Sequence, residues 1–194
     1  MAVVKASMPE TGLRLALERT PNPAARRAIF ATGLSASAAW TDPAAAPPLA
    51  AALLSLDGVA EIAAGPDFLT VRADSAARWD TPAFEVGVLG ALLDARLRGL
   101  DLGAVSAAAS PVVDHDPADA EVVALIESLI AERLRPLVEG DGGEIALVSF
   151  RDGVARVALR GACSGCPSSA GTLRAGVERL LRYYVPEVVR VEPA

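Results

Sequence analysis

The sequence predicts an α+β protein that consists of two small domains of mixed α/β structure, joined by an acidic flexible linker. Two observations predict this class. Segments with the two-residue period of strands alternate along the 194 residues with segments of helical period. A stretch without sustained period then separates two such groups. We therefore expect an N-terminal domain at 1–100, a linker at 101–118 and a C-terminal domain at 119–194.

The proposed linker lies in DLGAVSAAASPVVDHDPADA at 101–120. This stretch is rich in small residues and has two prolines, four acidic side chains and no basic one. Such a composition is typical of a connecting segment rather than of a packed element.

The first domain begins with alternating leucines, Leu13, Leu15 and Leu17, which predict a half-buried strand. The two prolines of Thr20-Pro21-Asn22-Pro23 predict a turn after it. In order, we expect a strand at 12–18, a turn at 20–23, a strand at 26–33, a short helix at 48–56, two strands within 58–73 and a helix at 82–98.

The second domain opens with a helix start, because Asp116 can cap the helix and Pro117 suits its first position. This helix should end or kink near Pro136. The Asp152-Gly153 pair between two alternating runs predicts a hairpin. In order, we expect a helix, a hairpin, a cysteine pair, a second helix and a final strand, with apolar stripes on the two helices at Val122, Ile126, Leu129, Ile130, Leu134 and Leu137, and at Leu173, Val177, Leu180, Leu181 and Tyr184.

Composition and charge exclude several classes of function. With 52% hydrophobic and 22% charged residues, the chain has the composition of a soluble globular protein. Its longest apolar tract, at 43–56, contains three prolines and is shorter than the roughly 20 residues of a membrane helix. The net charge is −6, and no dense basic run suggests nucleic-acid binding. The N-terminus lacks a recognisable targeting pattern, so we expect a cytoplasmic protein without membrane or nucleic-acid partners.

The chemistry of the chain is expected at Cys163 and Cys166, its only two cysteines. Cys163 should follow a strand, and Cys166 directly precedes Pro167, where a helix should begin. Unpaired N–H groups and the positive end of the helix dipole lower thiol pKa values at such a position, which favours metal ligation. In a reducing compartment, a metal site or a catalytic pair is expected more often than a structural disulfide.

The residues leave several alternatives open. Covalent haem attachment would need a histidine at Pro167. A thioredoxin-like thiol–disulfide oxidoreductase also places such a pair between a strand and a helix, but little chain follows the pair here. Zinc would need more ligands, and the only histidine, His115, is expected to be solvated in the linker. A cubane iron–sulfur cluster takes four thiolates, which two chains could supply together.

Sequence motifs of both domains resemble a known family. The stretch RPLVEGDGGEIALVSFRDGVARVALRGACSGCPSSAGTLRAGVERLL, with D-G-G and G-x-C-x-x-C-P, resembles the C-terminal domain of NifU-like (Nfu-type) iron–sulfur cluster carriers. The first part of the chain resembles the N-terminal domain of such proteins at TPNP (20–23), PLAAALLSLDGV (48–59), GPDFLTV (65–71) and Trp79.

The resemblance implies a non-enzymatic scaffold and carrier. By the family motif, Cys163 and Cys166 would ligate a [4Fe–4S] cluster that bridges the two subunits of a homodimer. The expected partners are an upstream cluster assembly scaffold and the apo forms of iron–sulfur client proteins. No catalytic residue is expected, and we assign Asp141-Gly142-Gly143, Trp40 and Trp79 structural roles.

Overall fold

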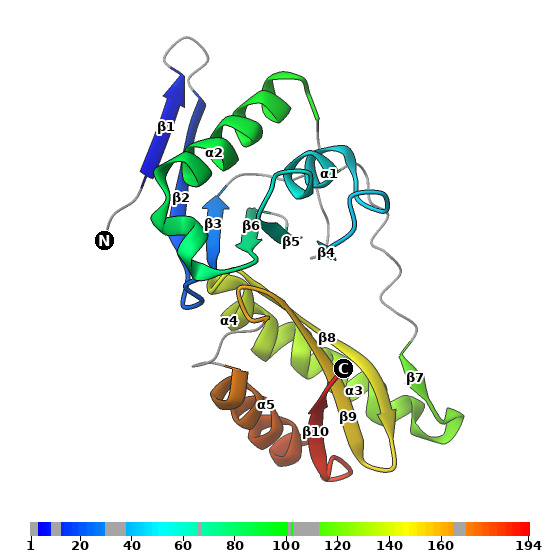
Figure 1. Cartoon of the computed structure of the whole chain (residues 1–194). Helices are drawn as coiled ribbons and strands as arrows, with labels where there is room; N and C mark the ends of the chain where they lie inside the picture. The colour runs from blue at the N-terminus through cyan, green and yellow to red at the C-terminus, as the bar shows by residue number, and fades with distance from the viewer. Residues whose placement is uncertain are drawn as a thin grey trace.

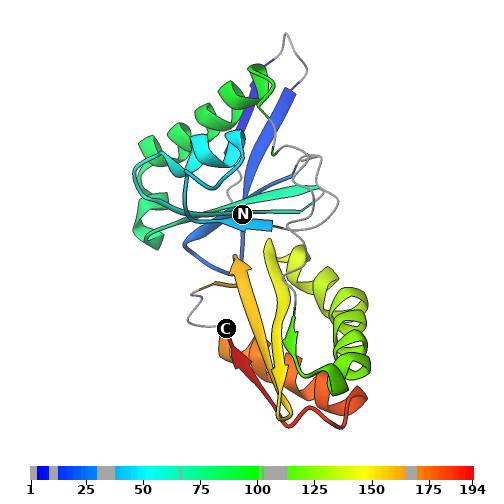
Figure 2. The ribbon, with the colours of Figure 1, turned by 90° about the vertical axis from the view of Figure 1, so that its right-hand side faces the viewer.

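The computed structural model contains two lobes, one stacked on the other (Figures 1 and 2). It describes residues 4–8, 13–29, 38–65, 67–100, 102, 113–164 and 170–194. Each lobe combines helices with its own sheet, and each has its own hydrophobic core. The predicted α+β class with two domains is confirmed.

The N-terminal lobe is built on a six-stranded antiparallel sheet. Its spatial order is β1-β2-β3-β6-β5-β4, so β6 and β5 form a hairpin inserted between β3 and β4. The strands are β1 Val4–Met8, β2 Leu13–Arg19, β3 Ala25–Ile29, β4 Ala38–Trp40, β5 Val59–Ala64 and β6 Phe68–Ala73.

Two helices, α1 Pro48–Leu54 and α2 Pro82–Leu97, pack with this sheet into the first core, and a 3-10 turn at Ala76–Asp80 precedes α2. Leu53, Ile62 and Leu92 are among its fully buried side chains. The Trp79 indole is buried, donates to the Ala24 carbonyl at 2.7 Å and contacts Phe84 edge to face, which confirms its packing role.

The C-terminal lobe begins with a helical stretch in several parts. The Asp116 carboxylate caps it as predicted, by accepting from the Ala118 N–H. A π-helical segment ends at Leu134, two residues before Pro136, whose ring does not fit the turn that precedes it in a regular α-helix. The parts are a 3-10 turn Pro117–Asp119, α3 Ala120–Leu129, the π segment Ile130–Leu134 and α4 Arg135–Gly140.

A four-stranded sheet of order β10-β9-β8-β7 carries the second core. The hairpin of β8 and β9 turns at Asp152 and Gly153, whose φ angles of 50° and 75° suit a type I′ turn, as the sequence predicts. Helix α5 leads from β9 to β10, which pairs parallel with β9. The elements are β7 Asp114–His115, β8 Gly143–Arg151, β9 Val154–Gly161, α5 Ala170–Tyr184 and β10 Arg190–Pro193.

The structure differs from the sequence-based expectations at several places. Strands β1, β4 and β7 were not expected; β7 places His115 in a strand rather than in a solvated loop. Tyr184 and Leu137 are exposed and do not belong to the buried stripes of their helices. Leu102 packs in the first core, whereas residues 103–112 of the expected linker lie outside the described part of the chain, so the domain boundaries stay a prediction.

Among the described residues, none of the helices combines the length and the apolar character that crossing a membrane requires.

Candidate functional site

Cys163 lies in a tight turn that begins with the last two residues of β9 and is here called the cysteine turn, defined as residues 160–164. The turn is closed by two backbone hydrogen bonds, from Cys163 N–H to the Arg160 carbonyl at 3.3 Å and from Ser164 N–H to the Gly161 carbonyl at 3.1 Å. Gly161 has a φ of +65°, which favours glycine. Cys166, the second expected ligand, lies outside the described residues.

The Cys163 side chain points into the second hydrophobic core and is only 7% exposed. It lies over Gly143, at the start of β8: a Cβ atom on Gly143 would stand 2.4 Å from the Cys163 Sγ atom. The same Cβ would also stand 3.1 Å from Val138. Glycine at 143 therefore makes room for the cysteine sulfur.

Gly142 supports the cysteine turn through its backbone. Its φ of +79° is a conformation that other residues rarely adopt. Its carbonyl accepts the Ala162 N–H at 3.1 Å and the Thr70 hydroxyl at 2.7 Å. The Asp141-Gly142-Gly143 motif thus has the structural role that the sequence predicts, and that role is to hold the turn that carries Cys163.

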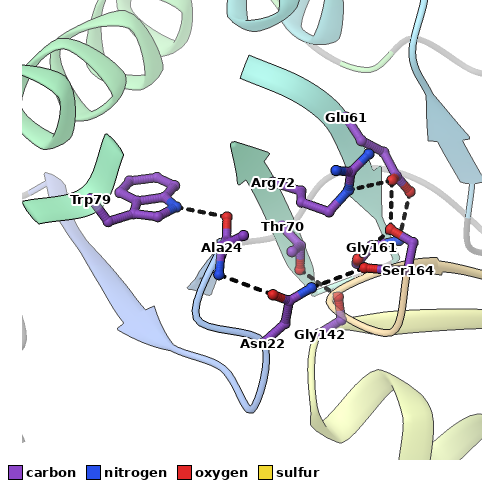
Figure 3. Close-up of polar contacts among 9 residues, drawn as sticks. All are labelled: Asn22, Ala24, Glu61, Thr70, Arg72, Trp79, Gly142, Gly161 and Ser164. Atoms are coloured by element: carbon purple, nitrogen blue, oxygen red, sulfur yellow. Dashed lines mark hydrogen bonds and ion pairs between the residues drawn. The ribbon is translucent and has the colours of Figure 1, made fainter. Parts of the chain in front are cut away.

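The N-terminal domain contacts this turn through Glu61, a buried carboxylate of β5 (Figure 3). Its two oxygens accept the Gly161 N–H at 2.6 Å and the Ser164 hydroxyl at 2.8 Å. Arg72, on the neighbouring strand β6, donates to the same carboxylate at 2.8 Å. The Glu61 carboxylate therefore forms an ion pair with Arg72 of its own domain and also accepts hydrogen bonds from the cysteine turn.

Asn22 makes a second contact from the N-terminal domain. Its Nδ2 atom donates to the Ser164 carbonyl at 2.9 Å, while its Oδ1 atom accepts the Ala24 N–H at 2.9 Å (Figure 3). The predicted Pro21-Asn22-Pro23 turn is thereby confirmed, and it presents Asn22 to the cysteine turn.

A second buried carboxylate, Glu144, lies next to Gly143 on β8. Burial raises the pKa of Glu144, against the attraction of Arg160 and Arg135. Its Oε2 atom has no hydrogen-bond partner within the described residues and stands 3.7 Å from the Arg160 guanidinium. Arg160 therefore forms an ion pair with Glu144.

The geometry separates Cys163 from His115. His115 pairs with Phe150 at one end of β8, whereas Cys163 lies over Gly143 at the other end. Seven residues of strand span about 20 Å or more. The part of the chain that the structure describes contains no group of three or more His, Cys, Asp or Glu side chains that could hold a metal ion. A zinc site that combines Cys163 with His115 of the same chain is therefore excluded by distance.

Sequence reasoning missed Glu61, Asn22 and Thr70, which contact the cysteine turn or its support. One signal was available for Glu61: it is the only charged residue in the strand VAEIAA, and a carboxylate buried there needs a partner. The identity of that partner, 100 positions away, could not be read from the sequence.

The structure is that of a two-domain α+β protein with Cys163 at the turn that follows β9. A family model described as NifU-like domain matches residues 126–192. A second, described as Scaffold protein Nfu/NifU N terminal, matches residues 15–89. Together they cover most of the chain.

Curated relatives agree with these matches. NifU-like protein 4, mitochondrial, of Arabidopsis thaliana is 39% identical over 150 residues, which are 75% of this chain and 52% of that protein. NFU1 iron-sulfur cluster scaffold homolog, mitochondrial, of Homo sapiens is 35% identical over 145 residues, 75% of this chain and 56% of that protein. The chain belongs to the NifU-like family, in the form with an Nfu-type N-terminal domain.

The chain spans about half the length of these relatives. Both are mitochondrial by name, as is NifU-like protein 5 of Arabidopsis thaliana, which is 38% identical over 149 residues, 75% of this chain and 53% of that protein. These relatives contradict the cytoplasmic location that we expected from the N-terminal sequence, and that prediction is wrong. None of the three is described as an oxidoreductase, so the thioredoxin-like alternative gains no support from them.

Proposed function

We propose that this protein is a non-enzymatic scaffold and carrier of iron–sulfur clusters. The observation that carries the proposal is the position of Cys163, in a glycine-supported turn between β9 and α5 of the domain that the NifU-like model matches. A relative named as an iron–sulfur cluster scaffold supports the same role.

The cluster is a [4Fe–4S] cubane held between two copies of the chain. A cubane takes four thiolates, and the chain has two cysteines, Cys163 and Cys166. Two chains related by a twofold axis supply the full set. The cluster is cargo in this scheme: it arrives from an upstream assembly scaffold and leaves to the apo form of a client protein.

The proposed mechanism is ligand exchange. Cys163 and Cys166 bind iron as thiolates, and the cysteines of a client replace them one by one. Since half of the ligands come from each subunit, loss of one subunit's thiolates leaves the cluster with open iron positions. Part of the association energy of the dimer is metal–thiolate bonding, so release of the cluster should favour monomers.

The test is anaerobic reconstitution with iron and sulfide, followed by visible spectroscopy, iron analysis and native mass spectrometry. The expected product is a dimer with about four irons per two chains. Cys163→Ser and Cys166→Ser should each abolish cluster binding, since each removes two of four ligands, and circular dichroism establishes that each variant is folded. Ser128→Ala, at an exposed serine of α3, is the matched control. A monomer with a complete cluster, or a Cys166→Ser protein with undiminished iron content, would contradict the shared site.

The metal-free protein separates this function from thiol–disulfide exchange. Multiple turnover on an insulin-like disulfide substrate with a dithiol reductant is what an oxidoreductase would show. We expect no such turnover. Efficient reduction by the metal-free protein would favour the oxidoreductase.

A further inference from the structure

We propose that the N-terminal domain is a clamp on the cysteine turn, in which Glu61 and Asn22 are positioning residues that keep Cys163 turned inward until the clamp opens. The inference rests on the proposed function and concerns the regulation of the same site. It assigns to the N-terminal domain a direct part in loading and release of the cluster.

The clamp holds the cysteine turn on both sides of Cys163. Before the cysteine, Glu61 accepts the Gly161 N–H at 2.6 Å. After the cysteine, Glu61 accepts the Ser164 hydroxyl at 2.8 Å and Asn22 donates to the Ser164 carbonyl at 2.9 Å. Moving the backbone of this turn away from β8 therefore requires breaking at least one of these bonds.

The clamped state keeps Cys163 from a second chain. Its side chain is packed in the second core, over Gly143. A cluster shared between two subunits needs sulfur atoms that both chains can present at an interface. The cysteine turn must therefore move before Cys163 can bind iron in that arrangement.

The clamp is preformed on the N-terminal domain. Arg72 donates to Glu61 at 2.8 Å from the neighbouring strand, and the Ala24 N–H fixes the amide of Asn22 (Figure 3). Both side chains are thus oriented by their own domain. Binding of the turn therefore costs little additional side-chain entropy.

The clamp can open without loss of either fold. The hydrophobic residues of the two lobes form two separate clusters, and the hydrogen bonds between the lobes are polar contacts of the clamp, of Arg27 with the Gly140 carbonyl and of Thr70 with the Gly142 carbonyl. One small apolar contact accompanies them, since the buried Ala63 packs closely against Gly161. Water can replace the polar contacts when the domains part, and Cys163 is the core side chain that leaves its cluster while the rest of both cores stays packed.

The experiment measures the alkylation rate of Cys163 in metal-free full-length protein that carries Cys166→Ser, so that one thiol remains. The variants are Glu61→Gln and Asn22→Asp, which preserve side-chain size. A glutamine at 61 has one acceptor oxygen instead of two, so it cannot accept the Gly161 N–H on one oxygen and Arg72 and the Ser164 hydroxyl on the other, as the carboxylate does. An aspartate at 22 has no donor for the Ser164 carbonyl. Asp57→Asn is the matched control, because Asp57 is a carboxylate of the same domain with a side chain that is 90% exposed.

Since alkylation follows the population of the open turn, and a charge-assisted hydrogen bond contributes roughly a factor of ten to such an equilibrium, Glu61→Gln should alkylate about tenfold faster. Asn22→Asp should also be faster, and Asp57→Asn should not change the rate. Circular dichroism establishes that each variant is folded. If Glu61→Gln does not fold, Thr70→Val, which removes the donor to the Gly142 carbonyl, replaces it.

Rates within twofold of the parent in the folded variants would overturn the clamp, as would an equal acceleration in Asp57→Asn. Iron uptake during reconstitution, with both cysteines present, supplies the second readout: its initial rate should rise in Glu61→Gln. If Glu61→Gln alkylates faster but neither the parent nor any variant takes up iron, the proposed function is refuted and the clamp remains supported. Normal iron uptake with unchanged alkylation would refute the clamp alone.

Discussion

The packing of Cys163 on Gly143 makes Gly143→Ala a direct test of the inward position of the cysteine. The new Cβ would stand 2.4 Å from the Cys163 Sγ atom. Ordinary contacts between heavy atoms lie near 3.5–4.0 Å, so the two atoms must separate by about 1 Å or more. No positive φ is required at Gly143, and the backbone itself accepts alanine. The sulfur must therefore move, or β8 must.

The magnitude follows from two opposing effects. Overpacking in a well-packed core costs about 1–3 kcal/mol. Replacement of glycine reduces the entropy of the unfolded chain and returns about 0.4–1 kcal/mol. The net expectation is a loss of about 1–2 kcal/mol in the free energy of unfolding of the C-terminal domain. Rotation of the sulfur out of the core would relieve the clash and expose the thiol.

Two assays separate these responses. Hydrogen exchange of peptides from β8 and β9 reports the stability of the C-terminal domain, while fluorescence of Trp40 and Trp79 follows the N-terminal domain, which holds both tryptophans. Gly140→Ala is the matched control, since nothing lies within 4 Å of a Cβ at this last residue of α4. Equal stability of Gly143→Ala and Gly140→Ala, together with an unchanged alkylation rate of Cys163, would refute the inward packing.

Two further predictions concern stability. Gly153→Ala should destabilise the hairpin by at least about 1 kcal/mol, because Gly153 has a φ of +75° and its Cβ would meet Val189 at 2.7 Å. Gly176→Ala in α5 is the control and should stabilise by up to about 1 kcal/mol. Urea midpoints compare the two variants, and a higher midpoint for Gly153→Ala than for Gly176→Ala would contradict the turn geometry. Glu144→Gln should be increasingly favoured over the parent as pH rises from 4.5 to 7: burial raises the pKa of Glu144 above its ordinary 4.5, so the folded state holds the proton more tightly and stability falls as pH rises through this window. Parallel pH profiles of the two proteins would show that Glu144 contributes no such term.

Most elements were predictable because their signals are local. The Asp152-Gly153 turn, the Asp116 cap and the alternating leucines of β2 each reflect preferences of neighbouring residues, and the structure confirms them. Strand β4, AAW, escaped prediction because three residues are too short to show a period, whereas VKASM of β1 does alternate apolar and polar residues, and this short signal was overlooked. They become strands by pairing with β2 and β5, which is a tertiary effect.

The candidate site was predictable only in part. The cysteine motif made Cys163 a candidate ligand, which stays a prediction, and the glycines predicted an unusual backbone conformation, since both are short-range patterns. That this backbone lies against Cys163 was not predicted. The contact of Glu61 with the cysteine turn joins two domains across 100 positions. No period or turn signal encodes such a contact. A buried acid in an apolar strand indicates that the carboxylate has a partner, but the sequence does not show which residue that partner is.

The division between apolar cores and a polar clamp bears on why a carrier would have two domains. A resident cofactor is served best by ligands that never leave it, and hence by a site within one rigid core. A cargo must be gained and lost many times, so the element that binds it needs two positions of similar free energy. In the proposed clamp the cysteine turn meets this requirement, because its bonds to Glu61 and Asn22 are few, polar and exchangeable with water. Opening the clamp thus changes the exposure of Cys163 and leaves the separate apolar cores folded.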